Sequence, residues 1–293
     1  TVLPECAIAE SKFEKGEDVS SRMLTLVSKI SEVQNKGTPD IEFALVGLLV
    51  RNQIDTGRAE DAINTLTAMK ERFAERGFER FMPNINAMLC RIALRRSDMA
   101  HAEEWYRSEA PKDVLNMRTL KRYLYFTKAM TELASGNEEA ALLTLSPLEP
   151  YCIRCDRHID TIHLKLLCAI AKQRRNDNTW KEDISMAMSI AEEYGFVRTV
   201  STYGAVILPL LEESKNGEFA QKVIKAARNQ AVYYPDFLKP KKYLSEKLTD
   251  AEIQVLRLLC ADKSNSEIGE ILNIRLATVK SHVSHILQKL GVS

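Results

Sequence analysis

The sequence is poor in residues that interrupt helices, with 11 glycines and 9 prolines among its 293 residues. It also lacks long stretches in which valine and isoleucine alternate with polar residues, the pattern of half-buried strands. Few turns and no strand pattern favour a small number of long helices. The sequence therefore predicts an all-α protein.

Long apolar runs are missing as well, since none approaches the roughly 18 residues that a membrane-spanning helix needs. The first ten residues, TVLPECAIAE, lack the basic region and apolar core of a signal peptide. The six cysteines are scattered, and Cys90, Cys168 and Cys260 lie within apolar helical patterns. Buried thiols of this kind are typical of a reducing compartment. We therefore expect a cytoplasmic protein with no membrane partner.

Net charge is also low, at +1, so no global basic field indicates nucleic-acid binding. Any surface that binds DNA must be local. The sequence contains no G-x-x-x-x-G-K-[ST] phosphate loop and no pairing of a nucleophile with a base. We therefore expect neither enzyme activity nor a cofactor.

A repeat of about forty residues organises the N-terminal part of the chain. Each unit has a turn residue, followed five positions later by a small residue that lets the next helix cross close to the previous one. The turn residues are Gly16, Gly57, Ser97 and Gly136, and the small residues are Ser21, Ala62, Ala102 and Ala141. Stacked helical hairpins of this kind bury a continuous core and form a superhelix.

These units resemble tetratricopeptide repeats, although their period is nearer forty residues than the usual 34. An irregular further unit is expected to comprise His163–Ile170, a turn near residues 176–179 and a helix over Trp180–Tyr194. We place this repeat domain at residues 1–234 and expect it to sense a small-molecule or protein effector, because such superhelices expose a concave groove. Candidate ligand contacts are Arg51, Arg91, Arg122 and Tyr125, with ordinary solvent exposure or packing as the alternative at each position.

A linker is predicted at residues 235–247, where Pro235 and Pro240 block regular helix. Three lysines cluster in it, namely Lys239, Lys241 and Lys242. They suit either a solvated linker or phosphate contacts beside a DNA-binding domain.

Three short helices are predicted in residues 248–293. Thr249 and Glu252 form a capping box at the first helix, and Ser264 or Asn265 caps the second. The third spans roughly residues 277–290 and follows the second after a tight turn. This is a helix-turn-helix arrangement.

The third of these helices has two distinct faces. A helical wheel places one set on the core side, namely Val279, Val283, Ile286, Leu287 and Leu290. It places the other set on the exposed side, namely Lys280, Ser281, Ser284, His285 and Gln288. The helix contains no Asp or Glu. Small residues, hydrogen-bond donors and an absence of acids are what a recognition helix in a DNA groove needs. From helix composition alone, an ordinary solvent-exposed surface is the alternative.

Residues 248–292 closely resemble the LuxR/GerE-type helix-turn-helix domain. The matching residues include Leu248, Thr249, Glu252, Val255, Leu256, Asn265, Glu267, Ile268, Leu272, Ile274, Thr278, Val279, Lys280, His282, Val283, Ile286, Lys289, Leu290 and Gly291. The upstream stretch ISMAMSIAEEYGFVRTVSTYGAVILPLLEES resembles the segment that closes the repeat domain of MalT-like regulators.

The resemblance implies a bacterial transcription regulator whose terminal domain binds promoter DNA in the major groove. It implies base contacts from Lys280, Ser281 and Ser284, and phosphate contacts from Thr278, His282, Asn265 and Lys289. The sequence departs from the family at Asp262, where a glycine is usual, and at Arg275, which replaces a usual helix cap but could itself reach a phosphate.

The same resemblance implies segments that this sequence does not include. Family members carry a fourth, dimerising helix beyond the position of Ser293, so we expect the terminal domain to be truncated before it and the full protein to form homo-oligomers. A nucleotide-binding ATPase domain, if the full protein has one, would lie upstream of Thr1. A protein-interaction adaptor with a secondary DNA-binding module is the alternative function.

A cluster of metal-ligand residue types lies at YCIRCDRHIDTIH, with Cys152, Cys155, His158 and His163. The C-x2-C spacing suits a zinc site or a redox pair, but it also occurs by chance in packed helices. We expect ordinary packing here and no metal.

Overall fold

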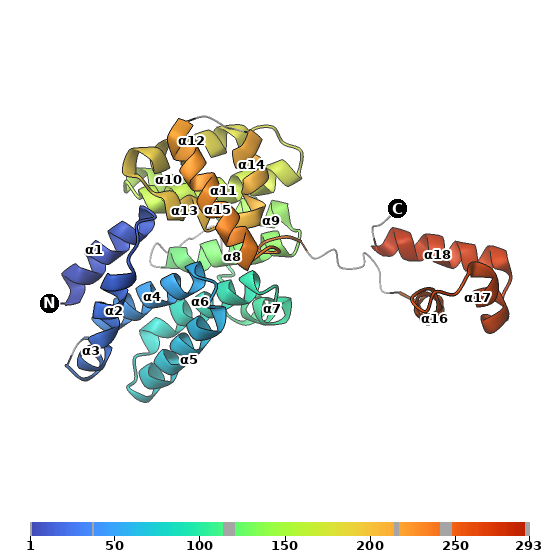
Figure 1. Cartoon of the computed structure of the whole chain (residues 1–293), viewed down its shortest axis with the longest axis horizontal. Helices are drawn as coiled ribbons and strands as arrows, with labels where there is room; N and C mark the ends of the chain where they lie inside the picture. The colour runs from blue at the N-terminus through green and yellow to red at the C-terminus, as the bar shows by residue number, and fades with distance from the viewer. Residues whose placement is uncertain (1, 37, 114–120, 214–216, 241–247, 291–293) are drawn as a thin grey trace. The chain divides into compact units, whose positions relative to one another are not determined.

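The computed structural model of the chain describes residues 2–36, 38–113, 121–213, 217–240 and 248–290. Within these ranges the regular secondary structure is helical throughout, which confirms the all-α prediction (Figure 1). The chain divides into two compact units, Thr1–Lys239 and Pro240–Ser293, and each is described by itself. None of the helices in the described ranges has both the length and the apolar character that crossing a bilayer requires.

The first unit consists of antiparallel helical hairpins stacked in chain order. Its helices are α1 (Val2–Glu14), α2 (Ser20–Ser28), α3 (Ile30–Lys36), α4 (Pro39–Asp55), α5 (Ala59–Glu75), η1 (Glu79–Phe81), α6 (Met82–Arg95), α7 (Met99–Ser108), α8 (Arg122–Ala134), α9 (Glu138–Leu145), α10 (Leu148–Arg154), α11 (His158–Arg174), α12 (Trp180–Tyr194), α13 (Val197–Ser201), η3 (Gly204–Val206), α14 (Leu208–Glu213) and α15 (Gly217–Tyr233). The second unit consists of α16 (Asp250–Leu259), α17 (Asn265–Leu272) and α18 (Leu276–Leu290).

The repeat turns adopt the backbone conformation that the turn residues favour. Gly16, Gly57, Ser97 and Gly136 all have positive φ, at 74°, 77°, 57° and 73°. The irregular unit uses Asn176 in the same way, with a φ of 58°. Glycine adopts this left-handed conformation without strain, and asparagine tolerates it better than most other residues do. One conformation therefore closes each hairpin, although three different residue types provide it.

The small residue after each turn behaves as expected in three of the four units. Ala62, Ala102 and Ala141 are completely buried, at 0% exposure. Ser21 is exposed, which corrects the prediction for the first hairpin. There the buried positions are Val19, just before α2, and Met23 and Leu26 within it, so Ser21 lies on the solvent side.

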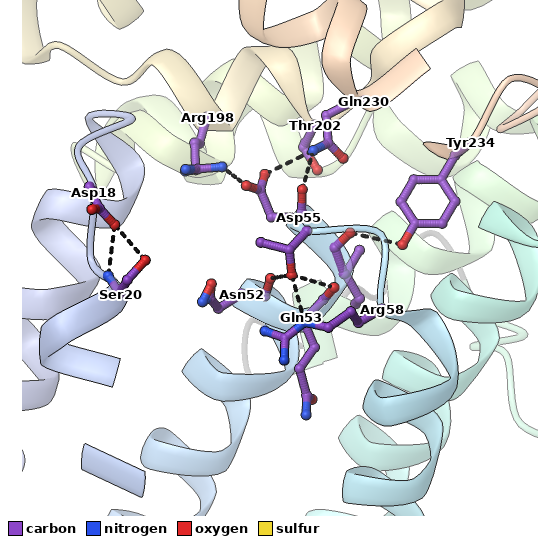
Figure 2. Close-up of polar contacts among 12 residues, drawn as sticks. Asp18, Ser20, Asn52, Gln53, Asp55, Arg58, Arg198, Thr202, Gln230 and Tyr234 are labelled. Carbon is purple, nitrogen blue, oxygen red and sulfur yellow. Dashed lines mark hydrogen bonds and ion pairs between the residues drawn. The ribbon is translucent and has the colours of Figure 1, made fainter. Parts of the chain in front are cut away.

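The superhelix of the first unit curls back until its last helices meet the end of α4 (Figure 2). Gln230 on α15 donates a hydrogen bond to the backbone oxygen of Asp55 at 2.7 Å, and Arg198 on α13 forms an ion pair with the carboxylate of Asp55. The phenol of Tyr234 donates to the backbone oxygen of Ile54 at 2.8 Å. These contacts join residues far apart in the sequence and close the unit around its inner helices.

Gly57 lies against the end of α15 at this closure. A Cβ atom built at this position would lie 2.6 Å from the ring of Tyr233. Any side chain at residue 57 would therefore displace the half-exposed Tyr233 ring, and the φ of 77° would add backbone strain.

The boundary of the first unit differs from the predicted linker. Phe237 and Leu238 are each 1% exposed and pack in the core that includes Tyr234. The chain after α15 therefore remains packed on the first unit as far as Lys239. Lys241, Lys242 and the rest of 241–247 lie outside the described residues.

Candidate functional sites

The helix-turn-helix unit is held together by a small apolar core. Val255, Ile268, Val279 and Ile286 are buried at 0–1% exposure and bring the three helices together. Two capping boxes fix where α16 and α17 begin. Thr249 and Glu252 cap α16, as predicted, and Ser264 rather than Asn265 caps α17 together with Glu267. Each box satisfies backbone N–H groups that the first turn of a helix leaves without partners.

The turn between α17 and α18 is packed against α17 itself. Asn273 has a φ of 52° and ends α17, and the Ile274 N–H donates to the Gly269 carbonyl at 2.9 Å. A Cβ at Gly269 would lie 2.9 Å from the Ile274 carbonyl oxygen. Gly269 is therefore the residue that lets the turn approach the helix, and this approach sets the direction in which α18 leaves. Asp262 provides the left-handed residue after α16, with a φ of 55°, where the family usually has glycine.

Helix α18 presents the face that the wheel predicts, except at Leu287, which was expected in the core and is 39% exposed. Val279 and Ile286 are buried, while Lys280, Ser281 and Ser284 are exposed. The helix has no acidic residue, so its exposed face combines a cation with hydroxyl groups and carries no charge that would repel a phosphate. Such a face can donate hydrogen bonds to the acceptor atoms of base edges.

The residues expected at phosphates occupy less uniform positions. Thr278 and Arg275 are exposed beside the N-terminus of α18, whereas Asn265 and His282 are half-buried. Exposure of Thr278 in the first turn suits an anion, because the N-terminal end of the helix dipole favours negative charge.

Lys289 is held inside the unit. Its ammonium lies 2.9 Å from the Glu252 carboxylate, and its side chain is 14% exposed. The hydrogen bond from Lys289, with those from Thr249, lowers the pKa of Glu252 to about 2. Lys289 therefore links the end of α18 to the capping box of α16, a role that no local pattern indicates because the two residues are 37 positions apart.

In the first unit, a cavity of about 280 Å³ lies among the inner helices of the repeats. Residues from α1, α4, α6, α8, α11 and α13 line it. Three of the four predicted ligand candidates belong to this lining, namely Arg51, Arg91 and Arg122. Tyr125 does not. It is 2% exposed, and its hydroxyl donates to the Asp113 carbonyl at 2.6 Å.

Sequence reasoning missed further residues of the cavity, chiefly Arg95, Arg198 and His163. Arg95 follows Arg91 by one helical turn, so the i, i+4 spacing was a usable signal. Arg198 reaches the cavity through the closure of the superhelix, which no repeat pattern indicates. His163 had been grouped with the cysteine cluster, but its Nδ1 lies 2.9 Å from the Tyr203 hydroxyl. Burial, with the charge of Arg91, lowers the pKa of His163 to about 3.

The cysteine and histidine cluster does not assemble. Cys152 is buried, and burial raises the pKa of its thiol to about 11, while Cys155 is exposed. The His158 ring stacks on Tyr194 with centroids 4.4 Å apart, and its Nε2 is 3.0 Å from the Tyr194 hydroxyl. Among the residues that the structure describes, no group of three or more His, Cys, Asp or Glu side chains could hold a metal ion.

Comparison with known proteins agrees with both units. Residues 8–216 match the family model of the MalT-like TPR region, and residues 246–293 match that of the bacterial regulatory proteins of the luxR family. Curated relatives include the response regulator protein VraR from Staphylococcus aureus strains NCTC 8325, COL and N315. Each is 36% identical over 90 residues, which cover 28% of this chain and 43% of the relative. The chain thus matches less than half of the length of these relatives.

The repeat-region match extends over more than half of the chain, and the helix-turn-helix match takes in all three helices of the second unit. The chain therefore belongs to the MalT-like class of the LuxR family of bacterial regulatory proteins.

Proposed function

We propose that this chain is the effector-binding and DNA-reading part of a bacterial transcription regulator. The acid-free exposed face of α18 supports this proposal most directly, together with the luxR-family match of the unit that contains it. In the proposed complex, α18 enters the major groove. Lys280 donates to guanine acceptors, and Ser281 and Ser284 contact neighbouring base edges. Thr278, Arg275, Asn265 and His282 lie toward the flanking phosphates.

The proposed DNA affinity of one copy is low. Residues 248–293 contain five basic and five acidic residues, so few phosphate counterions would be released on binding. We therefore propose that the protein acts as a homo-oligomer, which multiplies the contacts with DNA, and that it works in the cytoplasm. The repeat unit is proposed to bind an effector and to act as a regulatory element rather than as an enzyme.

A polarisation titration of the full chain against duplex DNA tests the proposal, with a duplex enriched by selection and a scrambled duplex compared at low salt. Lys280→Ala should reduce affinity for the selected duplex by about five- to 150-fold, because one good base contact contributes about 1–3 kcal/mol. Thr278→Ala should weaken both duplexes alike, since phosphate contacts carry no sequence information.

Lys225→Ala, an exposed change on α15 of the other unit, removes the same charge and serves as the control. It should bind both duplexes as the unaltered chain does. If Lys280→Ala behaves like Lys225→Ala, or if the two duplexes bind equally well, α18 does not read bases. The adaptor alternative would then be favoured.

A further inference from the structure

The cavity of the first unit has an apolar wall crossed by charged groups. Phe13, Val50, Met88, Phe126 and Met130 contribute apolar surface to its lining. Five arginines also reach it, and they are Arg51, Arg91, Arg95, Arg122 and Arg198. The carboxylates in the lining are Glu10, Glu14, Asp55 and Asp160. Charge is therefore concentrated in a space that is otherwise built like a ligand pocket.

Three of the five arginines are neutralised by these acids. Arg198 pairs with Asp55, and Arg122 lies 3.0 Å from Asp160. Arg51 pairs with the carboxylate of Glu10 at 2.7 Å and also with that of Glu14. All four carboxylates of the lining are thus engaged with arginines other than Arg91 and Arg95.

Arg91 and Arg95 are left without an acidic partner among the described residues. Arg91 donates to the Thr127 hydroxyl at 2.8 Å and to the Tyr123 carbonyl at 3.0 Å. Arg95 donates to the Thr202 hydroxyl at 3.0 Å. The Nε of Arg95 is buried and has no hydrogen-bond acceptor in the described structure. Hydroxyl and carbonyl groups solvate a guanidinium in part, but they do not neutralise its charge.

The two groups also lie on one side of α6. They are four residues apart, so their side chains are neighbours on the helix surface. Like charges at this spacing destabilise a helix. An anion placed between the two guanidinium groups would relieve this repulsion. Burial lowers the pKa of Arg95, which shows the same cost of holding this charge away from water. A guanidinium nonetheless stays protonated in proteins, so the positive charge persists.

We propose that this cavity binds a small organic anion, a carboxylate or phosphate on an apolar body, with Arg91 and Arg95 holding the charged group. This deepens the proposed effector role of the repeat unit and rests on it. A guanidinium fork is suited to carboxylate and phosphate oxygens, and such hydrogen bonds are about twice as strong as neutral ones. The volume of about 280 Å³ limits the ligand to a small molecule.

The rest of the lining suits the apolar body of such a ligand. His163 is neutral, because burial lowers its pKa to about 3, so it adds no charge to the cavity. Its ring can exchange hydrogen bonds with the Tyr203 hydroxyl. Phe126 and Met130 offer apolar contacts nearby.

Stacking on aromatic rings is the alternative explanation for Arg91 and Arg95. The Arg91 guanidinium lies 3.7 Å from the Tyr123 ring centroid, and that of Arg95 lies 4.4 Å from the Phe237 centroid.

Thermal unfolding and calorimetry of the full chain separate these explanations. The probes are phenyl phosphate, 3-phenylpropionate and the neutral 3-phenylpropanamide, each to about 10 mM at constant ionic strength, which is tenfold above a Kd of 1 mM. Both anions should raise the melting temperature to a plateau, and the amide should not. Arg95→Met and Arg91→Met keep most of the apolar stem and should each weaken anion binding about tenfold or more.

Arg96→Met is the matched control. It follows on the same helix but pairs with Glu60 at 2.6 Å, and it is not part of the cavity lining. It should bind the anions within about twofold of the unaltered chain. Should Arg95→Met fail to fold, Arg95→Lys keeps the charge but loses the fork and should still bind several-fold more weakly. Arg91→Met provides the second test.

Three results would overturn the anion site. They are no shift with either anion, equal shifts with the amide, or unchanged anion binding in both Arg91→Met and Arg95→Met. The two arginines would then be stacking residues only. DNA titrations of the same samples keep the proposals distinguishable. Loss of sequence-specific DNA binding would remove the proposed function but leave a measured anion site, and the reverse result would leave a DNA-reading unit without this effector class.

Discussion

Replacing Gly269 with alanine should loosen the turn that positions the recognition helix. Alanine normally stabilises a helix interior by about 1 kcal/mol relative to glycine. Here its Cβ would lie 2.9 Å from the Ile274 backbone oxygen and 3.7 Å from a methyl group of Val279. A backbone carbonyl in a tight turn cannot rotate away as a flexible side chain would, and overpacking costs about 1–3 kcal/mol. Because the clash is with backbone, the cost should lie in the upper part of that range, about 2–3 kcal/mol. Subtracting the helix preference leaves a net loss of about 1–2 kcal/mol in the second unit.

Gly47 offers the opposite case within the same chain. It lies in the interior of α4, and no heavy atom approaches within 4 Å of a Cβ built there. Gly47→Ala should therefore gain the ordinary helix preference, about 1 kcal/mol, and stabilise the first unit. The same chemical change should have opposite signs in the two units, so a general effect of adding a methyl group cannot explain both.

Hydrogen exchange measured by mass spectrometry on the full chain resolves the two units. In Gly269→Ala, peptides covering α17 and α18 should exchange about tenfold faster, since 1.4 kcal/mol corresponds to a factor of ten. Both tryptophans of the chain, Trp105 and Trp180, lie in the first unit, so urea unfolding followed by tryptophan fluorescence reports Gly47→Ala separately. Unchanged or slower exchange of α17 and α18 in Gly269→Ala would refute the close packing of this turn.

Four further changes test the ionisable groups. Glu252→Gln should destabilise the second unit at neutral pH. In the unaltered chain, acid should remove this contribution between pH 4.5 and about 2, as the carboxylate of Glu252 with its lowered pKa is protonated. Hydrogen exchange of peptides from α16 and α18 at a series of pH values, corrected for the intrinsic exchange rate, measures it. His163 binds a proton in the unfolded chain below pH 6.5 but in the folded chain only near pH 3. Acidification should therefore cost the first unit about 1.4 kcal/mol per pH unit in that window, and His163→Asn should flatten this slope in urea titrations. Arg198→Met leaves the partly buried Asp55 without its partner and should lower the free energy of unfolding by about 3 kcal/mol. Arg228→Met is the control, because it removes a surface pair in which 61% of the arginine side chain is exposed. It should cost less than about 1 kcal/mol in the same urea titration.

The sequence predicted what depends on neighbouring residues. The repeat turns at Gly57 and Gly136, the capping box at Thr249 and the buried face of α18 each follow from residues within a few positions of one another. Backbone preference and helical periodicity act over that range, so a single sequence was enough.

The remaining features depend on tertiary closure. The ion pair of Lys289 with Glu252 joins two helices, and the packing of Phe237 on the first unit draws in residues whose prolines indicated a linker. The cavity required the end of α4 to meet α13, through the Arg198 and Asp55 pair, and no repeat pattern specifies that contact. Three of its arginines were nonetheless candidates, because polar residues on the inner helices of a superhelix face its groove.

Selection of bound duplexes from a random-sequence pool by the full chain is the sharpest test of whether α18 reads DNA. The unaltered chain should enrich a defined motif, and Lys280→Ala should lose the preference for guanine at one position of that motif while keeping the others. Lys225→Ala should return the same motif as the unaltered chain. If the pool recovered with the unaltered chain stays random, or if Lys280→Ala returns an identical motif, the assignment of α18 as the recognition helix is wrong.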